Sequence, residues 1–149
     1  MLNEIVCTIT TFAWDSDAGK LGPVETVSAL PPGVVAQPNF TAAEILTVGN
    51  HVYATIRGHD SVSVFAADVR TGRLTFVQNV PAGGKTPRGL GIDPSGRWLL
   101  VGDQGSGQVV EYSIDPQTGE LSPTGQELKV GSPVDVKFAS VEPAAQARP

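Results

Sequence analysis

The chain has 149 residues, 40% of them hydrophobic, with a mean hydropathy of +0.01 and a formal net charge of −5 at pH 7. This composition is typical of a folded domain of ordinary size, and the interspersed acidic and basic residues leave no basic stripe for a nucleic-acid backbone. Because no run of 18 apolar residues occurs and the N-terminus lacks the charged and apolar regions of a signal peptide, we predict no membrane partner and a cytoplasmic location.

The first forty residues, 1–40, predict an incomplete four-stranded repeat followed by a loop. Strand-like alternation over 5–14 and 24–28 indicates the last two strands of that repeat. The Pro- and Gly-rich segment 30–40 predicts a long loop. Trp14 lies in a predicted strand and is expected to fill space between repeats.

Two complete repeats follow, at residues 41–84 and 85–131. In the first of them, strands are predicted at 44–48, 52–56, 62–67 and 74–80. In the second, they are predicted at 88–92, 98–101, 108–114 and 126–130. Trp98 is again expected between repeats. No segment has the apolar spacing of an amphipathic helix, so the predicted fold class is all-β.

A turn motif of the form Asp-x-x-x-Gly-x-Leu occurs three times, at residues 15–21, 68–74 and 115–121. Its glycines, Gly19, Gly72 and Gly119, are 53 and 47 residues apart. In such a hairpin connection the Asp side chain bonds the backbone two residues on, and the Gly adopts a positive φ. The spacing suits one β-propeller blade for each repeat, since blades recur about every 40 to 50 residues.

The chain closes on a partial repeat, residues 132–141, in which 134–138 is predicted to be the first strand of a further blade. The Pro- and Ala-rich segment 142–149 is predicted to be disordered. Residues 1–141 therefore predict a partial β-propeller of about three four-stranded antiparallel blades, too short to close a ring. The open ends require either N-terminal blades missing from this sequence, or a homodimer in which each copy lends its C-terminal strand to the other.

Six short stretches occur in an order and spacing that make a specific match: Asn3-Glu4, Ala43-Glu44-Ile45, Arg57-Gly-His59-Asp60-Ser61, Thr86-Pro87-Arg88-Gly89, Asp93-Pro-Ser-Gly96-Arg-Trp98-Leu-Leu and Ser132-Pro133-Val134. Together they resemble the C-terminal part of the seven-bladed β-propeller lactonase family, which includes 6-phosphogluconolactonases and carboxy-cis,cis-muconate cyclases. The resemblance covers residues 2–139. It implies a site at one mouth of the central channel and metal-free hydrolysis of a sugar δ-lactone, most notably 6-phosphogluconolactone to 6-phosphogluconate.

The resemblance also maps polar site positions onto this chain. It implies catalytic roles for Glu4, Arg57 and Arg88, and substrate-binding roles for Glu44, His59, Asp103 and Gln104. Three positions depart from the family pattern. Ile56 stands where Asn is usual, Asp103 where Asn or a small residue is common, and Asp135 where an apolar residue or Cys is frequent.

These residue types suit lactone hydrolysis, which needs a base to prepare water, a positive charge for the oxyanion and a cationic clamp for a phosphate. Glu4 or Glu44 could act as the base. Arg57 and Arg88 suit bidentate contact with phosphate or carboxylate. The alternative for Arg88 is a structural ion pair with Glu44 or Asp103, and the alternative for His59 is turn chemistry.

The residues that usually bind metals are sparse. Cys7 is the only cysteine, which excludes an intramolecular disulfide and a zinc site with several thiolates, and we expect it to be a small buried side chain. His51 and His59 are eight residues apart without flanking ligands, and His51 beside a Gly-Asn turn is expected to be exposed. The sequence therefore predicts no metal and no cofactor.

Two rival functions are compatible with the same sequence. An enzyme of the same fold that cyclises an unsaturated diacid would use two arginines and a carboxylate equally well. A non-catalytic propeller module that serves only for binding or assembly is the rival from another class, because fold alone does not decide function.

Overall fold

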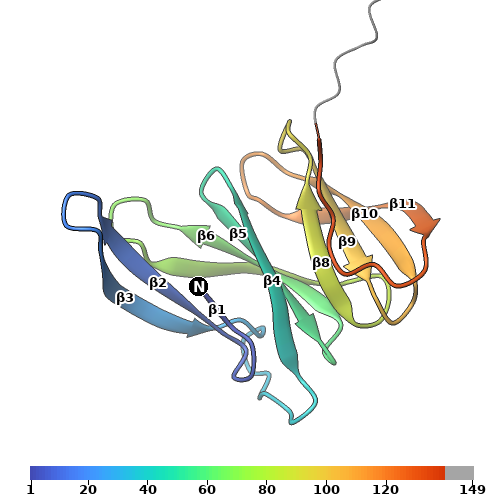
Figure 1. Cartoon of the computed structure of the whole chain (residues 1–149), viewed down its shortest axis with the longest axis horizontal. Coiled ribbons are helices and arrows are strands. Elements are labelled where there is room, and N and C mark those ends of the chain that lie inside the picture. Colours follow the sequence, from blue (N-terminus) through green and yellow to red (C-terminus); the bar gives the residue numbers. More distant parts are fainter. Residues whose placement is uncertain (140–149) are drawn as a thin grey trace, which may run out of the picture.

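The computed structural model describes residues 1–139, which form three antiparallel sheets standing side by side (Figure 1). The first sheet consists of β1 (Leu2–Asn3), β2 (Thr8–Asp15) and β3 (Lys20–Ser28). The second consists of β4 (Thr41–Val48), β5 (His51–Arg57), β6 (Ser61–Ala67) and β7 (Leu74–Pro81). The third consists of β8 (Pro87–Ile92), β9 (Trp98–Asp103), β10 (Gln108–Ile114) and β11 (Leu121–Lys129).

The predicted all-β partial propeller is confirmed: residues 1–139 contain no helix, and in each sheet every strand pairs with its neighbour in sequence. It follows that no helix in this range is long and apolar enough to span a membrane. The first sheet differs from the prediction by one strand. The short β1 adds a third strand, because Leu2 and Asn3 pair with Ile9 and Thr8.

The second and third sheets are copies of one repeat in the same register. His51 pairs with Ala66 at the start of β5, and Trp98, 47 residues after His51, pairs with Ser113 in the same way. The offset of 47 residues therefore relates structurally equivalent positions in the two sheets, as it relates the glycines of the turn motif.

The turn motif forms the hairpins that its residues predict. Asp68 Oδ1 accepts hydrogen bonds from the backbone N–H groups of Arg70 at 2.8 Å and Thr71 at 3.1 Å. The other two motifs make the same pair of bonds, to Asp15 and to Asp115. The glycine of each motif has a positive φ, between 62° and 74°. These local hydrogen bonds thus fix where β2, β6 and β10 end.

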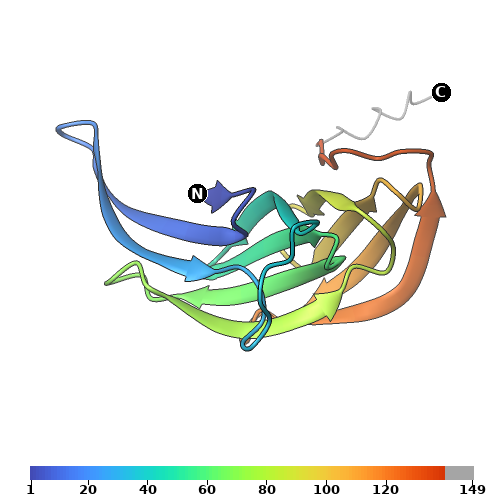
Figure 2. The same ribbon diagram turned by 90° about the horizontal axis from the view of Figure 1, so that it is seen from below.

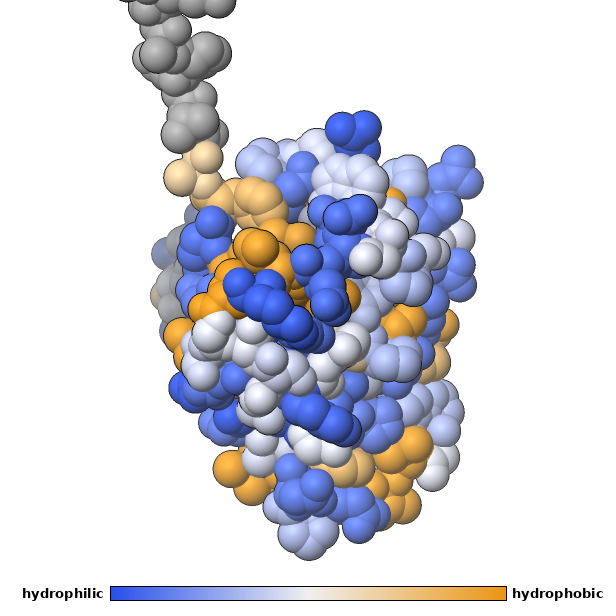
Figure 3. Space-filling model, turned by 90° about the vertical axis from the view of Figure 1, so that its right-hand side faces the viewer, coloured by the Kyte–Doolittle hydropathy of each residue, from blue (hydrophilic) through white to orange (hydrophobic). Residues whose placement is uncertain are grey.

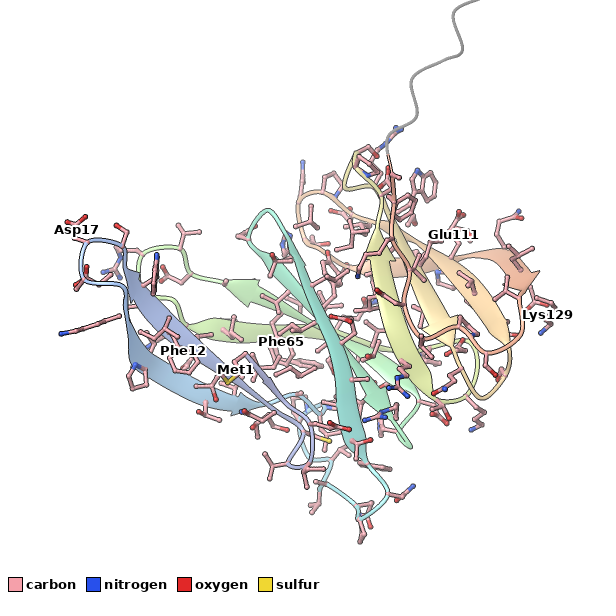
Figure 4. All side chains as sticks on the ribbon, viewed as in Figure 1. Met1, Phe12, Asp17, Phe65, Glu111 and Lys129 are labelled. Atoms are coloured by element: carbon pink, nitrogen blue, oxygen red, sulfur yellow. The ribbon has the colours of Figure 1, made fainter. Side chains whose placement is uncertain are left out.

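Apolar side chains fill the spaces between neighbouring sheets. Between the first and second sheets lie Ile9, Ala54, Ile56 and Phe65, all at most 2% exposed. Figure 4 shows Phe65 in this space. A larger cluster lies between the second and third sheets; it contains Tyr53, Val62, Val64, Leu90, Leu99, Val101, Tyr112 and Leu121. Each such side chain contributes about 1.5–3 kcal/mol on burial, so sheet stacking is the main source of stability.

The outer face of the third sheet has no neighbour within residues 1–139. Tyr53 and Val62 are fully buried between sheets, whereas their equivalents 47 residues later, Leu100 and Val109, line an open groove. Figure 3 shows hydrophobic side chains in a hollow on this side, overlain by hydrophilic ones. Glu111 and Lys129 lie on the side of the third sheet remote from the second (Figure 4).

Trp14 and Trp98 do not fill space between the three described sheets, since their exposed fractions are 62% and 38%. Trp98 alternates with the buried Leu99 along β9 and so belongs to the outer face of the third sheet. Trp14 stands 53 residues before Ala67, which packs toward the first sheet, and so belongs to the equivalent uncovered face at the other end. Neither face is covered by another sheet within the described range.

Two predictions about single residues had opposite outcomes. Cys7 is fully buried, as predicted. His51 is only 6% exposed, so the prediction of an exposed side chain is wrong. The reason is that Gly119 of the third sheet packs directly against the His51 ring, so closely that any side chain there would overlap it.

Residues 130–139 contain no strand, so the predicted strand at 134–138 is not formed within the described residues. The segment instead packs on β8: a methyl group added at Gly89 would lie 2.7 Å from Asp135 Cα. A strand needs a neighbour that accepts and donates its ladder hydrogen bonds, and none lies beside this segment in residues 1–139. Figure 2 shows this segment on the same side of the molecule as the N-terminus. The predicted disordered tail, 142–149, lies outside the described residues.

Candidate functional site

The repeat places three of the predicted site residues at equivalent positions. Glu4, Arg57 and Gln104 are separated by 53 and 47 residues, the same offsets that separate the turn motifs. Arg57 ends β5, while Glu4 and Gln104 directly follow the ends of β1 and β9. Since equivalent ends of successive blades open at the same mouth of a propeller, these three residues lie at one end of the sheets.

β-Bulges aim two further residues toward the same end. The pairing of β4 with β5 shifts register between Ala42 and Ile45, which leaves Glu44 in an irregular stretch. The pairing of β8 with β9 shifts between Pro87 and Gly89, which leaves Arg88 as the extra residue. A bulge redirects the side chain of its extra residue, so the alternation of β4 and β8 by itself does not show where Glu44 and Arg88 point.

Four of the predicted residues line one open pocket of about 250 Å³. The pocket is lined by Glu4, Ala43, Glu44, Arg57, Arg88 and Val134. Its charged residues come from the turn after β1 and from strands β4, β5 and β8, so all three sheets contribute. The formal charges of the two carboxylates and the two guanidinium groups cancel. The pocket is therefore polar but has no net formal charge.

Arg57 is held from two sides. Its Nη2 donates to the carbonyl oxygen of Ala42 at 3.1 Å and forms an ion pair with Glu4 Oε1. The Arg57 side chain is 21% exposed and that of Glu4 is 60% exposed. The pair therefore sits at the rim of the pocket, with the guanidinium fixed and the carboxylate open to a ligand or to water.

Arg88 is exposed and weakly bound. Its one hydrogen bond within residues 1–139 runs from Nη1 to Gln104 Oε1, at 3.4 Å. Over the same range it makes no ion pair with Glu44 or Asp103, which excludes the structural alternative considered for it. Its guanidinium donors are thus available for an anionic ligand.

Glu44 is half-buried and has no cationic partner within 4 Å among the described residues. Its Oε1 accepts a hydrogen bond from the backbone N–H of Ile45 at 3.2 Å, and its own N–H donates to Thr55 Oγ1 at 3.0 Å. The second bond fixes the bulged backbone. The carboxylate consequently keeps lone pairs free for a water molecule or a ligand hydroxyl.

His59 does not line this pocket. Its Nδ1 lies 2.6 Å from Ser61 Oγ, and its ring meets Phe40 edge to face at a centroid distance of 5.4 Å. These contacts match the turn role considered for His59, and a substrate-binding role has no geometric support here.

Asp103 is fully buried, so the structure contradicts a direct contact with a ligand in the pocket. The reason is strand alternation: with Leu99 and Val101, its side chain faces the second sheet, whereas Gln104 turns to the mouth. No cationic side chain lies within 4 Å of either carboxylate oxygen among residues 1–139. Burial is the largest influence and raises the pKa of Asp103 to about 7; the nearby Gln108 side chain lowers it, and repulsion from the carboxylate of Asp60 raises it further.

Val134 forms one wall of the pocket and was not predicted as a site residue from the sequence. Val134 belongs to the segment after β11, which was predicted only as the start of a further blade. The available signal was the match of Ser132-Pro133-Val134 to the family pattern, but spacing alone does not bring this segment against β8. Within the described residues there is no group of three or more His, Cys, Asp or Glu that could hold a metal ion.

Comparison with known sequences gives consistent matches. Residues 1–138 match the model of a family described as "Lactonase, 7-bladed beta-propeller". The 6-phosphogluconolactonase of Bacillus subtilis (strain 168) is 30% identical over 138 residues, which cover 93% of this chain and 40% of the relative. The 6-phosphogluconolactonase of Pectobacterium carotovorum subsp. carotovorum (strain PC1) is 29% identical over 141 residues, covering 95% of this chain and 42% of the relative.

Solved structures also match most of this chain. A periplasmic gluconolactonase of Pseudomonas aeruginosa superposes with a TM-score of 0.84 at 31% identity, over 93% of this chain and 38% of that one. A protein from Lactobacillus plantarum superposes with a TM-score of 0.86 at 27% identity, over 93% of this chain and 40% of that one. The chain thus spans about 40% of the length of the curated relatives that it matches.

Proposed function

This chain belongs to the lactonase family of seven-bladed β-propellers, and we propose that it binds and hydrolyses a sugar δ-lactone. The proposed substrate is 6-phosphogluconolactone and the product is 6-phosphogluconate. The observation that supports the proposal is the single pocket in which two arginines and two glutamates converge from all three sheets. Relatives named 6-phosphogluconolactonase point to the same substrate.

In this proposal Arg88 binds the substrate phosphate. Its guanidinium is exposed, and over residues 1–139 its one bond is a long one to Gln104, so a phosphate can replace that partner with two short charge-assisted bonds. Before the substrate binds, Gln104 orients the arginine. Arg57, already fixed by Glu4 and the Ala42 carbonyl, lies across the pocket and is suited to the developing negative charge on the lactone carbonyl oxygen.

The hydrolytic step needs one base. Glu44 or Glu4 removes a proton from water, the resulting hydroxide adds to the lactone carbonyl carbon, and the bond from that carbon to the ring oxygen breaks. The ring oxygen takes up a proton as it leaves. Among residues 1–139 no cationic group lies within 4 Å of Glu44, while Glu4 is more exposed, and both line the pocket. Glu44→Gln and Glu4→Gln should separate them, because the base variant loses kcat without a large change in KM.

The test is turnover of freshly prepared 6-phosphogluconolactone above its spontaneous rate by the purified protein. Arg88→Ala should raise KM for the phosphorylated lactone and leave KM for the phosphate-free lactone unchanged. Arg97→Ala is the matched control, because Arg97 is an exposed arginine that bonds Ser95 in the β8–β9 turn and does not line the pocket. Equal turnover of both lactones, unaffected by Arg88→Ala, would refute the phosphate role.

The rival from another class, a non-catalytic module, is favoured by one observation. The chain spans about 40% of its relatives, and the outer face of the third sheet is an open groove lined by Leu100, Val109 and Leu128. A well-folded protein with no turnover of either lactone would support this rival. Turnover of an unsaturated diacid would instead support the cyclase, since the same arginines can bind two carboxylates.

We further propose that additional blades complete the ring in the working protein, because the family has seven blades and residues 1–139 supply three sheets. They come either from a second copy or from blades that precede this sequence in a longer chain. Light scattering decides for the chain as given: a dimer supports the homodimer, and a well-folded monomer refutes it. The cytoplasmic location stays a prediction, since one structural neighbour is described as periplasmic.

A further inference from the structure

We propose that Asp60 is a positioning residue that fixes the distance between Arg57 and Arg88 across the pocket. The inference rests on the proposed function for its kinetic consequences. Asp60 lies in the turn between β5 and β6, three residues after Arg57, and it does not line the pocket itself. Its side chain is 14% exposed, unusually low for a charged residue in a hairpin turn.

The carboxylate of Asp60 joins this turn to the loop before Arg88. Oδ1 accepts hydrogen bonds from the backbone N–H of Gly58 at 3.2 Å and of Thr86 at 2.9 Å. Oδ2 forms an ion pair with Lys85 Nζ at 3.1 Å. Gly58 directly follows Arg57, and Thr86 stands two residues before Arg88. One carboxylate therefore holds the backbone beside both pocket arginines.

Comparison of the three repeats shows that the turn does not need this carboxylate. Cys7, Asp60 and Gly107 occupy equivalent positions, at offsets of 53 and 47 residues, and their φ angles are 48°, 53° and 63°. In each case the main-chain carbonyl accepts a backbone hydrogen bond after the fourth strand, at 2.8, 2.9 and 3.1 Å. Cysteine and glycine thus support the same turn and the same main-chain bond. The cross-loop bonds are an addition specific to Asp60.

The loop that follows the second repeat leads to Arg88, the exposed arginine of the pocket. Thr86 has a positive φ of 58°, and its carbonyl accepts a bond from the Gln104 N–H at 3.0 Å. The bulged Arg88 follows after Pro87, and within the described part of the chain its side chain bonds only that of Gln104. The start of β8 is consequently held by Asp60 on one side and by Gln104 on the other.

The charge state of Asp60 suits this role. Partial burial by itself would raise the pKa of Asp60, but hydrogen bonds from Thr86, Lys85 and Gly58 together lower it. The carboxylate therefore stays ionised at neutral pH, and bonds to an ionised acceptor are stronger than those between neutral groups.

The test uses two variants. Asp60→Gly fits the positive φ, as Gly107 shows, but removes the carboxylate. Asp60→Asn keeps an oxygen for the Gly58 and Thr86 amides and loses only the charge toward Lys85.

Arg57 is also held by Glu4 and the Ala42 carbonyl. Loss of the Asp60 carboxylate should therefore mainly weaken the bond from Arg88 to the phosphate. A tenfold change corresponds to about 1.4 kcal/mol, which is within what a bond to a charged group contributes, so we expect Asp60→Gly to raise KM for the phosphorylated lactone about tenfold, with kcat within about threefold of wild type. Asp60→Asn should restore most of the affinity.

Hydrogen exchange gives a readout that does not depend on activity. Amide protection over residues 84–90 should fall in Asp60→Gly and persist in Asp60→Asn. Asp68→Gly is the matched control, because Asp68 makes the same kind of turn bonds in the same sheet, remote from the pocket; it should lose protection only around its own turn. Unchanged protection and unchanged KM in Asp60→Gly would overturn the inference. Lost protection with no lactone turnover in wild type would instead refute the proposed function alone.

Discussion

Replacing Asp103 by asparagine should stabilise the protein at alkaline pH far more than at acidic pH. The carboxyl is fully buried between the second and third sheets, and among the described residues no cationic side chain pairs with it. Its pKa is raised from an ordinary value of 3.8 to about 7, chiefly by burial. An uncharged side chain of the same shape removes the cost of ionising this group in the folded state.

The sign and size follow from proton linkage. Below about pH 4, Asp103 is protonated in both the folded and the unfolded chain, so it adds no pH dependence. From about pH 4 to about pH 7 the unfolded chain ionises while the folded chain keeps its proton, and the free energy of unfolding falls. Each pKa unit corresponds to about 1.4 kcal/mol, so the shift from 3.8 to about 7 amounts to an upper value of roughly 4 kcal/mol.

The assay is urea unfolding of wild type and Asp103→Asn at pH 4 and at pH 8. The difference in unfolding free energy between the two proteins should grow by roughly 2–4 kcal/mol in favour of the variant from the lower to the higher pH. Taking this difference cancels the carboxylates that both proteins share. Asp17→Asn, in an exposed turn, reports the effect of removing one surface charge. A difference that is the same at both pH values would refute the raised pKa of the buried Asp103 carboxyl.

Three further predictions test the packing and the site. Arg57→Lys keeps the charge but cannot both pair with Glu4 and reach the Ala42 carbonyl, so kcat for the lactone should fall about 10²-fold; unchanged steady-state kinetics would contradict this role. Gly84→Ala places a methyl group 2.6 Å from Asp103 Oδ2 and should lower the free energy of unfolding, measured in urea, by about 1–3 kcal/mol. Equal urea midpoints for variant and wild type would show that the loop moves to make room for the methyl group without a cost in stability. Partial burial by itself would raise the pKa of Asp93, but hydrogen bonds from the β8–β9 turn lower it to about 2. Asp93→Asn should therefore be less stable than wild type in thermal unfolding above about pH 4 and should match it near pH 2, whereas a constant deficit would contradict the linkage.

The sequence predicted the features that depend on neighbouring residues. The Asp-x-x-x-Gly-x-Leu turns form because Asp68 and its equivalents bond their own backbone and the glycine accepts a positive φ, both local events. The offsets of 53 and 47 residues place Glu4, Arg57 and Gln104 at equivalent strand ends, so their position at one end of the sheets follows from the repeat.

Other features were beyond the reach of pattern and spacing. Bulges in β4 and β8 break the alternation of side chains, so the presence of Glu44 and Arg88 in the pocket was known only once the pairing was seen. The resemblance implied a substrate-binding role for Asp103, but the alternation of β9 turns this side chain with Leu99 and Val101 into the space between the sheets.

The amino-acid sequence alone determined the all-β class, the repeat length and the turns, because hydrogen bonding within a few residues and the alternation of strands set all three. Only the tertiary structure decided which faces are covered. Tyr53 is buried and Leu100, its equivalent, is open, because burial depends on whether another sheet stands alongside, and a repeating pattern is the same whether or not the neighbour is there.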